Sequence, residues 1–97
     1  IQAHRLIFEG RRAVGVATDA GEFRASRCIV LSAGAVETPK LLMLSGIGDG
    51  AALQALGIGT VAHSPDVGRN LQDHLIAKFI FRTRPCGTLN EIMAKGI

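Results

Sequence analysis

The sequence predicts a mixed α/β fold, with an antiparallel β-meander followed by a strand–turn–helix unit in an α+β arrangement. Two patterns support this prediction. The first two dozen residues alternate in polarity and are interrupted by glycine-containing turns. After them, an apolar run at residues 28–31 leads into the small residues 32–34 and then into a helical segment. A strand, a glycine turn and a helix in this order are typical of α/β proteins.

The meander is expected to contain three strands. Residues 3–8 form the first strand, residues 9–12 a turn with a central glycine, and residues 13–18 the second strand. A turn at residues 19–21 leads into the third strand at residues 22–24. Alternating polar and apolar side chains indicate that one face of this sheet is exposed to solvent.

The strand–turn–helix unit follows directly. Continuous apolar character at residues 28–31 predicts a strand buried on both faces, as in a largely parallel sheet. A helix is expected at residues 39–44, with Thr38 as its N-cap and Pro39 in its first position. The helix should end at residues 45–46, where a serine precedes a glycine.

The second half of the chain predicts shorter elements. Asp49 should cap a helix at residues 51–56, which ends at Gly57 in the usual C′ place. A short strand at residues 60–62 and an irregular loop with one helical turn at residues 65–73 come next. A last strand is expected from His74 or Leu75 to Arg82, because that stretch is rich in apolar and aromatic residues.

Composition excludes several classes of function. The 97 residues carry a net charge of +3, but the basic residues are scattered and the aromatic ones are four phenylalanines, so no nucleic-acid partner is expected. No apolar run approaches the roughly 18 residues of a membrane span. The three histidines, His4, His63 and His74, lack metal-ligand spacing, so no metal site is expected.

The two cysteines, Cys28 and Cys86, form no CxxC pair and indicate no disulfide framework. This pattern favours a reducing compartment, and a cytoplasmic location is therefore expected.

Two longer strings carry a family resemblance. Gly-Ala-Val-Glu-Thr-Pro-Lys-Leu-Leu-Met-Leu-Ser-Gly-Ile-Gly at residues 34–48 resembles the second signature of the glucose-methanol-choline (GMC) family of FAD-dependent oxidoreductases. Pro-Asp-Val-Gly-Arg-Asn-Leu-Gln-Asp-His at residues 65–74 resembles the family's Pro-x-Val-Gly-x-Asn-Leu-Gln-Asp-His segment. Residues 8–16 resemble the hairpin that precedes the signature. The resemblance covers nearly the whole chain and thins after about residue 80.

This resemblance implies the organisation of the molecule. The chain should be an internal fragment of a longer protein and not a folding unit of its own. Residues 1–74 would be part of a Rossmann-like FAD-binding domain, and residues 75–97 the start of a substrate-binding domain. The glycine-rich GxGxxG motif is expected before residue 1. The catalytic histidine and its partner are expected after residue 97, so no catalytic residue is assigned within the chain.

The resemblance also implies the chemistry, which is oxidation of an alcohol by hydride transfer to FAD, with an unidentified electron acceptor. Two alternatives stay open. A hydroxynitrile lyase branch of the family keeps FAD without net redox turnover. A non-catalytic module could have kept the fold and lost the flavin.

Three residues are assigned to FAD. Gly34, with Ala33 beside it, forms the turn on which the dinucleotide of GMC proteins lies, where a Cβ at the closest point would collide with the ligand. Gly34 as a simple tight-turn residue is the structural alternative. Ala3 falls where family members usually have a valine whose backbone touches the adenine end of FAD.

Other motif residues are assigned structural roles. The glycines of residues 45–48 follow a helix and have no nearby lysine, so they should let two helices meet and not form a phosphate loop. Asn70 and Asp73 should fix their loop by hydrogen-bonding backbone groups. His74 is expected to be structural, because the family's catalytic histidine lies further along the chain.

Ile76 gives the one indication of substrate. Choline dehydrogenase-like members that oxidise choline carry a glutamate two residues after the motif histidine, where a carboxylate meets the quaternary ammonium. An isoleucine there cannot stabilise that charge. The resemblance therefore implies a neutral alcohol, aliphatic or aromatic, with Ile76 in contact with the substrate.

Overall fold

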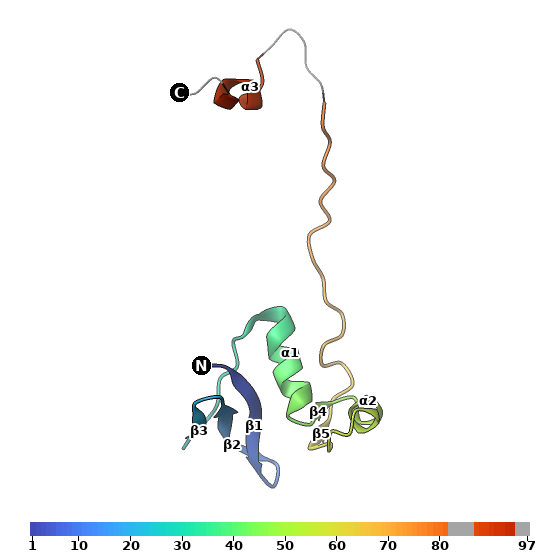
Figure 1. The fold of residues 1–97 in the computed structure, drawn as a ribbon. Helices are drawn as coiled ribbons and strands as arrows, with labels where there is room; N and C mark the ends of the chain where they lie inside the picture. Colours follow the sequence, from blue (N-terminus) through green and yellow to red (C-terminus); the bar gives the residue numbers. More distant parts are fainter. Residues whose placement is uncertain (82–86, 95–97) are drawn as a thin grey trace.

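The computed structural model describes residues 1–81 and 87–94 (Figure 1). A three-stranded sheet packs beside one long helix, and a second small unit lies at the far end of that helix. An extended segment then leads away from this body to a last helix. The radius of gyration is 22.7 Å, against about 13 Å for a compact domain of this length. The elements are β1 (Ala3–Glu9), β2 (Arg12–Thr18), β3 (Gly21–Arg24), α1 (Gly34–Leu44), β4 (Ile47–Gly48), α2 (Gly50–Ala55), β5 (Ala62–His63) and α3 (Leu89–Ala94).

The predicted meander is confirmed. Its strands pair antiparallel in the order β1-β2-β3. Leu6 pairs with Val16, and Val16 pairs with Phe23, so these three side chains share one face of the sheet. Leu6, only 6% exposed, is the buried member of this row, while Phe23 is 54% exposed at its outer end. The apolar face of the sheet is therefore covered over β1 and open over β3.

The helix α1 begins five residues earlier than the sequence predicts. It spans Gly34–Leu44, with Ala33 as N-cap and Pro39 inside the helix, so the prediction of Thr38 as N-cap is wrong. The Thr38 hydroxyl still serves the helix start, because its Oγ1 accepts a hydrogen bond of 3.0 Å from the backbone N–H of Ala33. Pro39 lacks the N–H that would bond the carbonyl one turn back, a loss that the helix tolerates here.

The predicted end of α1 is confirmed. Ser45 is the C-cap, and Gly46 follows with φ 84°, the left-handed conformation that commonly ends helices. A strand that the sequence analysis missed, β4, comes next and pairs in parallel with β5. Gly48 of β4 lies between α1 and α2, because a Cβ there would meet Met43 at 3.2 Å and Leu53 at 3.5 Å. The prediction that glycines of this segment let two helices meet is borne out at Gly48.

The short helix α2 follows the prediction closely. Its N-cap is Asp49, whose Oδ1 accepts a hydrogen bond of 3.1 Å from the Ala51 N–H. Gly57, with φ 73°, lies just beyond the C-cap. The strand predicted at residues 60–62 is shifted to Ala62–His63. Residues 65–68 form the single turn expected in the following loop.

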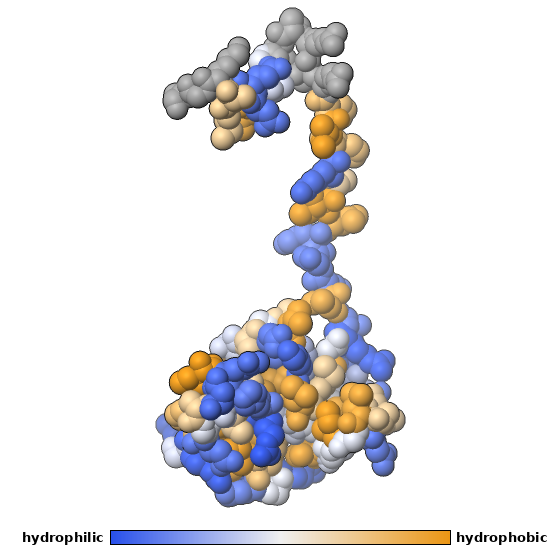
Figure 2. Space-filling model, viewed as in Figure 1, coloured by the Kyte–Doolittle hydropathy of each residue, from blue (hydrophilic) through white to orange (hydrophobic). Residues whose placement is uncertain are grey.

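Two predicted strands are wrong. Residues 28–31 form no strand, and Val30 is 81% exposed. The described part of the last predicted strand, residues 74–81, is also unpaired, and Leu75 and Ile80 are 101% and 97% exposed. A strand needs partners for its backbone groups, and the described residues supply none for either segment. Figure 2 shows apolar and hydrophilic residues alternating along this extended segment.

Helix α3, which the sequence analysis missed, begins after a Thr88 side chain that accepts from the Glu91 N–H at 3.3 Å. The Glu91 carboxylate in turn accepts from the Thr88 N–H at 3.0 Å. This reciprocal pair is a capping box, which satisfies two N–H groups at the helix start.

The buried core of the described residues is small. Its apolar side chains are Leu6, Leu41 and Leu53, and its one buried polar residue is Ser45. Leu6 and Leu41 come from β1 and α1, and Leu53 comes from α2. Within the body, β1 and β4 both contact α1, and α2 contacts β4.

Candidate functional site

The predicted cofactor contacts Ala33 and Gly34 form a turn at the start of α1. Gly34 has φ 87°, and a Cβ built on it would meet no atom within 4 Å. Ala33 and Gly34 are both exposed. The N-cap makes no side-chain hydrogen bond to the first turn of α1. The turn therefore offers bare backbone at the positive end of an 11-residue helix.

These features fit a flavin dinucleotide. A pyrophosphate and its sugars can lie against backbone only where no Cβ projects, and the space beside Gly34 is open. The uncapped N–H groups at the start of α1 suit an anionic or hydroxyl-rich ligand. The positive φ of Gly34 by itself also favours glycine, as the tight-turn alternative requires.

The start of β1 lies beside the middle and the C-terminal half of α1. Ala3 is exposed and lines a small cavity of about 80 Å³ together with Glu37, Lys40, Leu41 and Leu44 of that helix. Figure 1 shows that β1 and α1 both begin at the same end of the body. β1 and α1, which carry Ala3 and Gly34 about thirty residues apart in the sequence, thus begin on the same side of the body.

The motif at residues 65–74 forms a loop with two left-handed positions. Gly68 has φ 78°, and Asn70 is the single non-glycine residue with positive φ in the described chain, at 57°. Asparagine tolerates this conformation better than most residues, which explains its use at this position. The predicted hydrogen bonding to backbone is found for Asp73, whose Oδ1 accepts from the adjacent His74 N–H at 2.7 Å, but among the described residues no such bond is found for the Asn70 side chain.

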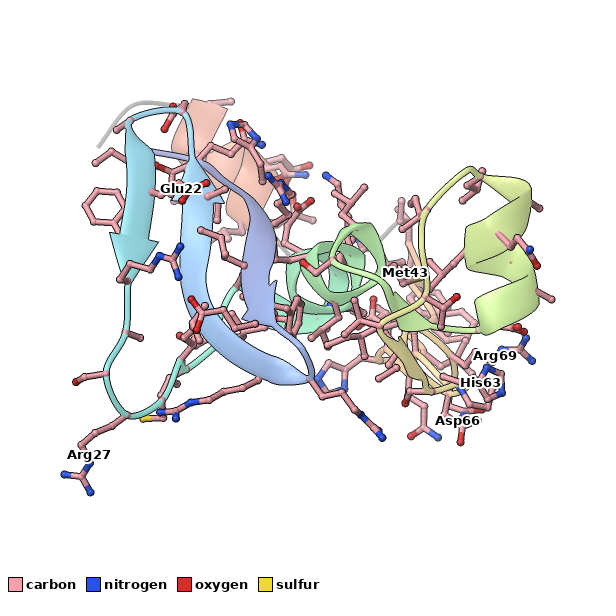
Figure 3. All side chains as sticks on the ribbon, turned by 90° about the horizontal axis from the view of Figure 1, so that it is seen from below. Glu22, Arg27, Met43, His63, Asp66 and Arg69 are labelled. Carbon is pink, nitrogen blue, oxygen red and sulfur yellow. The ribbon has the colours of Figure 1, made fainter. Side chains whose placement is uncertain are left out.

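The same loop is tied to the start of α2. Arg69 reaches the Asp49 carboxylate at 3.3 Å, and the Nδ1 atom of His63 accepts a hydrogen bond of 3.0 Å from the Gly50 N–H. Figure 3 shows Arg69 and His63 close together beside α2. The exposed Arg69–Asp49 ion pair contributes no more than about 1 kcal/mol to stability. These contacts connect the loop and β5 to the start of α2.

Ile76 lies apart from the other assigned residues. It is 71% exposed on the extended segment, two residues after His74. Farther along, the rings of Phe79 and Phe81 stack with centroids 6.4 Å apart. Within the described residues no side chain encloses Ile76, so a pocket there requires further chain.

Sequence reasoning missed the role of Ser45. Its hydroxyl is buried and bonds the backbone of both Leu6 and Leu41, which no local pattern could reveal. The only indication in the sequence was that Ser45 belongs to the family signature at residues 34–48. Among residues 1–81 and 87–94, no cluster of His, Cys, Asp and Glu could hold a metal ion, and no helix has the length and apolarity to cross a membrane.

Comparison with known proteins gives consistent matches. Residues 1–76 match the family model described as GMC oxidoreductase. The chain is 51% identical over 77 residues to the oxygen-dependent choline dehydrogenase of Brucella anthropi, covering 75% of this chain and 14% of that protein. It is 52% identical over 75 residues to the mitochondrial choline dehydrogenase of Homo sapiens, covering 73% and 13%. Patulin synthase of Aspergillus clavatus is 51% identical over 79 residues, covering 76% and 13%.

Solved structures agree with these matches. A crystal structure of formate oxidase superposes with a TM-score of 0.68 at 48% identity, covering 74% of this chain and 14% of that chain. A variant of the Aspergillus oryzae formate oxidase, made to study modification of its FAD, gives the same values. The chain therefore spans about 14% of the length of the first curated relatives it matches.

Proposed function

The chain belongs to the GMC oxidoreductase family, and from that premise we propose that it is part of an enzyme that oxidises an alcohol. FAD is the cofactor of the family. When bound, FAD supplies the hydride acceptor, and the protein positions it. The observation that carries the proposal is the open, exposed turn of Ala33 and Gly34 at the uncapped start of α1.

The residues of this chain would bind and orient the cofactor. Gly34 lets backbone approach the dinucleotide, because no Cβ intervenes. The backbone of Ala3, at the same end of the body, would contact the adenine portion. The base that takes the alcohol proton would come from the remainder of the protein, since the family resemblance places the catalytic histidine and its partner after residue 97.

Two alternative functions, a hydroxynitrile lyase and a non-catalytic module without flavin, can be distinguished from an oxidoreductase. The relatives bear on the first, and the yellow colour of bound flavin bears on the second. The names of two kinds of relative, choline dehydrogenase and formate oxidase, denote oxidations, which favours redox turnover over a lyase. A non-catalytic module that had lost flavin would give a colourless full-length protein.

The direct experiment uses the full-length protein. We expect it to purify with a flavin absorbance spectrum that bleaches under anaerobic conditions when a neutral alcohol is added. A flavin that stays oxidised with every alcohol, while the protein cleaves a cyanohydrin, would support the lyase instead.

Substrate choice is proposed to involve Ile76. Two of the relatives are choline dehydrogenases, so choline is the substrate to be tested against neutral alcohols. An apolar side chain at this position offers no charge to a trimethylammonium group. A neutral aliphatic or aromatic alcohol therefore fits Ile76 better than choline does.

We expect Ile76→Glu in the full-length enzyme to lower kcat/KM on benzyl alcohol by about tenfold or more, because it places an unpaired carboxylate in an apolar pocket. The relative rate on choline should rise. The matched control is Leu75→Glu, since adjacent side chains of an extended segment point to opposite sides. Kinetics on choline, benzyl alcohol and a medium-chain alcohol decide the matter. A wild-type preference for choline would contradict the assignment.

We infer a domain boundary after His74, with residues 1–74 in the FAD-binding domain and residues 75–97 opening the substrate-binding domain. The support is the exposed, extended course of residues 75–81, which leave the body formed by the earlier elements. We also propose a cytoplasmic location, because Cys28 and Cys86 form no CxxC pair and their spacing indicates no disulfide framework.

A further inference from the structure

Ser45 hydrogen-bonds to both β1 and α1 where the two elements pack together, and we call this contact the joint. Its side chain is buried, with a residue exposure of 7%. Its Oγ accepts a hydrogen bond of 2.8 Å from the Leu6 N–H and donates one of 2.6 Å to the Leu41 carbonyl. Leu6 and Leu41 are two of the three buried apolar residues in the part of the chain that the structure describes. The hydroxyl therefore lies at the centre of the contact between strand and helix.

The two hydrogen bonds fix more than the local contact. The bond to Leu41 lies within α1, so it holds the hydroxyl in one orientation on the helix. The bond to Leu6 then fixes that orientation to β1, across 39 residues of sequence. An apolar side chain of the same size would fill the space but leave the buried Leu6 N–H without a partner.

The joint lies at the C-terminal end of α1 and at the middle of β1, whereas the assigned cofactor contacts lie at the start of each element. Gly34 is about 16 Å from Ser45 along α1, at about 1.5 Å per residue. Ala3 is about 10 Å from Leu6 along β1, at about 3.3 Å per residue. A tilt of α1 by about 5° at Ser45 would move Gly34 by about 1.4 Å relative to Ala3. A displacement of this size exceeds the tolerance of about 0.5 Å within which the residues of a binding site must be held.

We propose that Ser45 is a positioning residue for FAD: its hydroxyl sets the angle of α1 on β1 and so the spacing of Gly34 and Ala3. The inference rests on the proposed function, in which these two segments contact FAD. It gives the serine of the signature a role that a helix C-cap alone does not require, since glycine at the next position already ends the helix.

The test measures the Kd of FAD for apoprotein prepared from the full-length enzyme, by flavin fluorescence. Ser45→Ala is expected to raise this Kd by about tenfold or more. Ser45→Thr keeps the hydroxyl and is expected to restore the Kd to within about threefold of wild type. The visible circular dichroism of bound flavin should change in Ser45→Ala and return in Ser45→Thr.

Leu53→Ala is the matched control. Leu53 is 2% exposed in α2, away from the joint between β1 and α1. Its removal should lower the melting temperature by leaving a cavity, while the Kd of FAD stays within about threefold of wild type. A merely structural role for Ser45 would make the two variants lose affinity in proportion to their melting temperatures.

Each outcome decides for or against the proposal. Wild-type affinity in Ser45→Ala, or the same loss in Ser45→Thr as in Ser45→Ala, overturns the positioning role and leaves the proposed function standing. A wild-type protein without FAD overturns both. If Ser45→Ala does not fold, Ser45→Cys is measured instead, because a thiol hydrogen-bonds only weakly. A raised Kd in that variant supports the role, and an unchanged Kd overturns it.

Discussion

The full-length Gly34→Val variant is expected to lose most of its FAD while keeping its secondary structure. The added side chain would project into the open space beside the turn, where the dinucleotide is assigned. Valine also resists the φ of 87° that Gly34 adopts, with a strain of about 1–2 kcal/mol. The measurement is the ratio of flavin to protein absorbance after purification, with far-UV circular dichroism to follow the fold.

The Gly57→Val variant separates steric exclusion of FAD from backbone strain as the cause of flavin loss. Gly57 has φ 73° and, like Gly34, would place a Cβ within 4 Å of no other atom. It carries the same backbone strain but lies beyond α2, away from the assigned cofactor contacts. Gly57→Val should therefore retain its flavin. Equal flavin loss in both variants would show that Gly34 is only a turn residue.

Gly46→Ala is expected to destabilise the full-length protein by about 2–4 kcal/mol, combining backbone strain with overpacking. Gly46 has φ 84°, and an added Cβ would collide with the carbonyl oxygen of Gly59 and lie 3.0 Å from the Val61 side chain. The Gly46 carbonyl also accepts hydrogen bonds from the N–H groups of Val61 and Ala62, so the backbone cannot move away freely.

Gly57→Ala provides the control here as well. It should lower the free energy of unfolding by only about 1–2 kcal/mol, since it carries the φ strain without a collision. Urea denaturation of the full-length variants, followed by circular dichroism, gives the comparison. Equal midpoints for Gly46→Ala and Gly57→Ala would contradict the close packing of β4 against the segment before β5.

Local patterns were sufficient for the elements whose partners are near in sequence. The meander follows from alternating polarity and from turn residues such as Gly10 and Gly21, because each strand pairs with the next one. The start and end of α2 follow from Asp49 and Gly57, a capping side chain and a left-handed glycine. No distant contact is needed for either prediction.

The wrong strands depended on partners outside these residues. Residues 28–31 and 75–81 have the apolar character of strands but lie exposed and unpaired. Apolar character reports what a segment buries in its complete fold, whereas a strand also needs neighbouring backbone. In a chain that spans about 14% of its relatives' length, those neighbours are expected elsewhere in the protein.

The start of α1 was misplaced for a different reason. Thr38 followed by Pro39 is a typical helix start, and the threonine hydroxyl does accept from an N–H at the N-terminus of α1. It does so from inside the helix, one turn after Ala33, which sequence spacing alone could not distinguish. For the candidate site, the openness of the turn at Gly34 and the joint at Ser45 both required the three-dimensional arrangement.

The central claim is that the turn of Ala33 and Gly34 contacts FAD in a GMC oxidoreductase. A crystal structure of the full-length protein with FAD tests it most directly. We expect the closest FAD atom to lie within about 4.5 Å of the Gly34 backbone, the range of van der Waals contact. An FAD molecule bound elsewhere, with water or another segment of the protein filling the space beside Gly34, would contradict the claim.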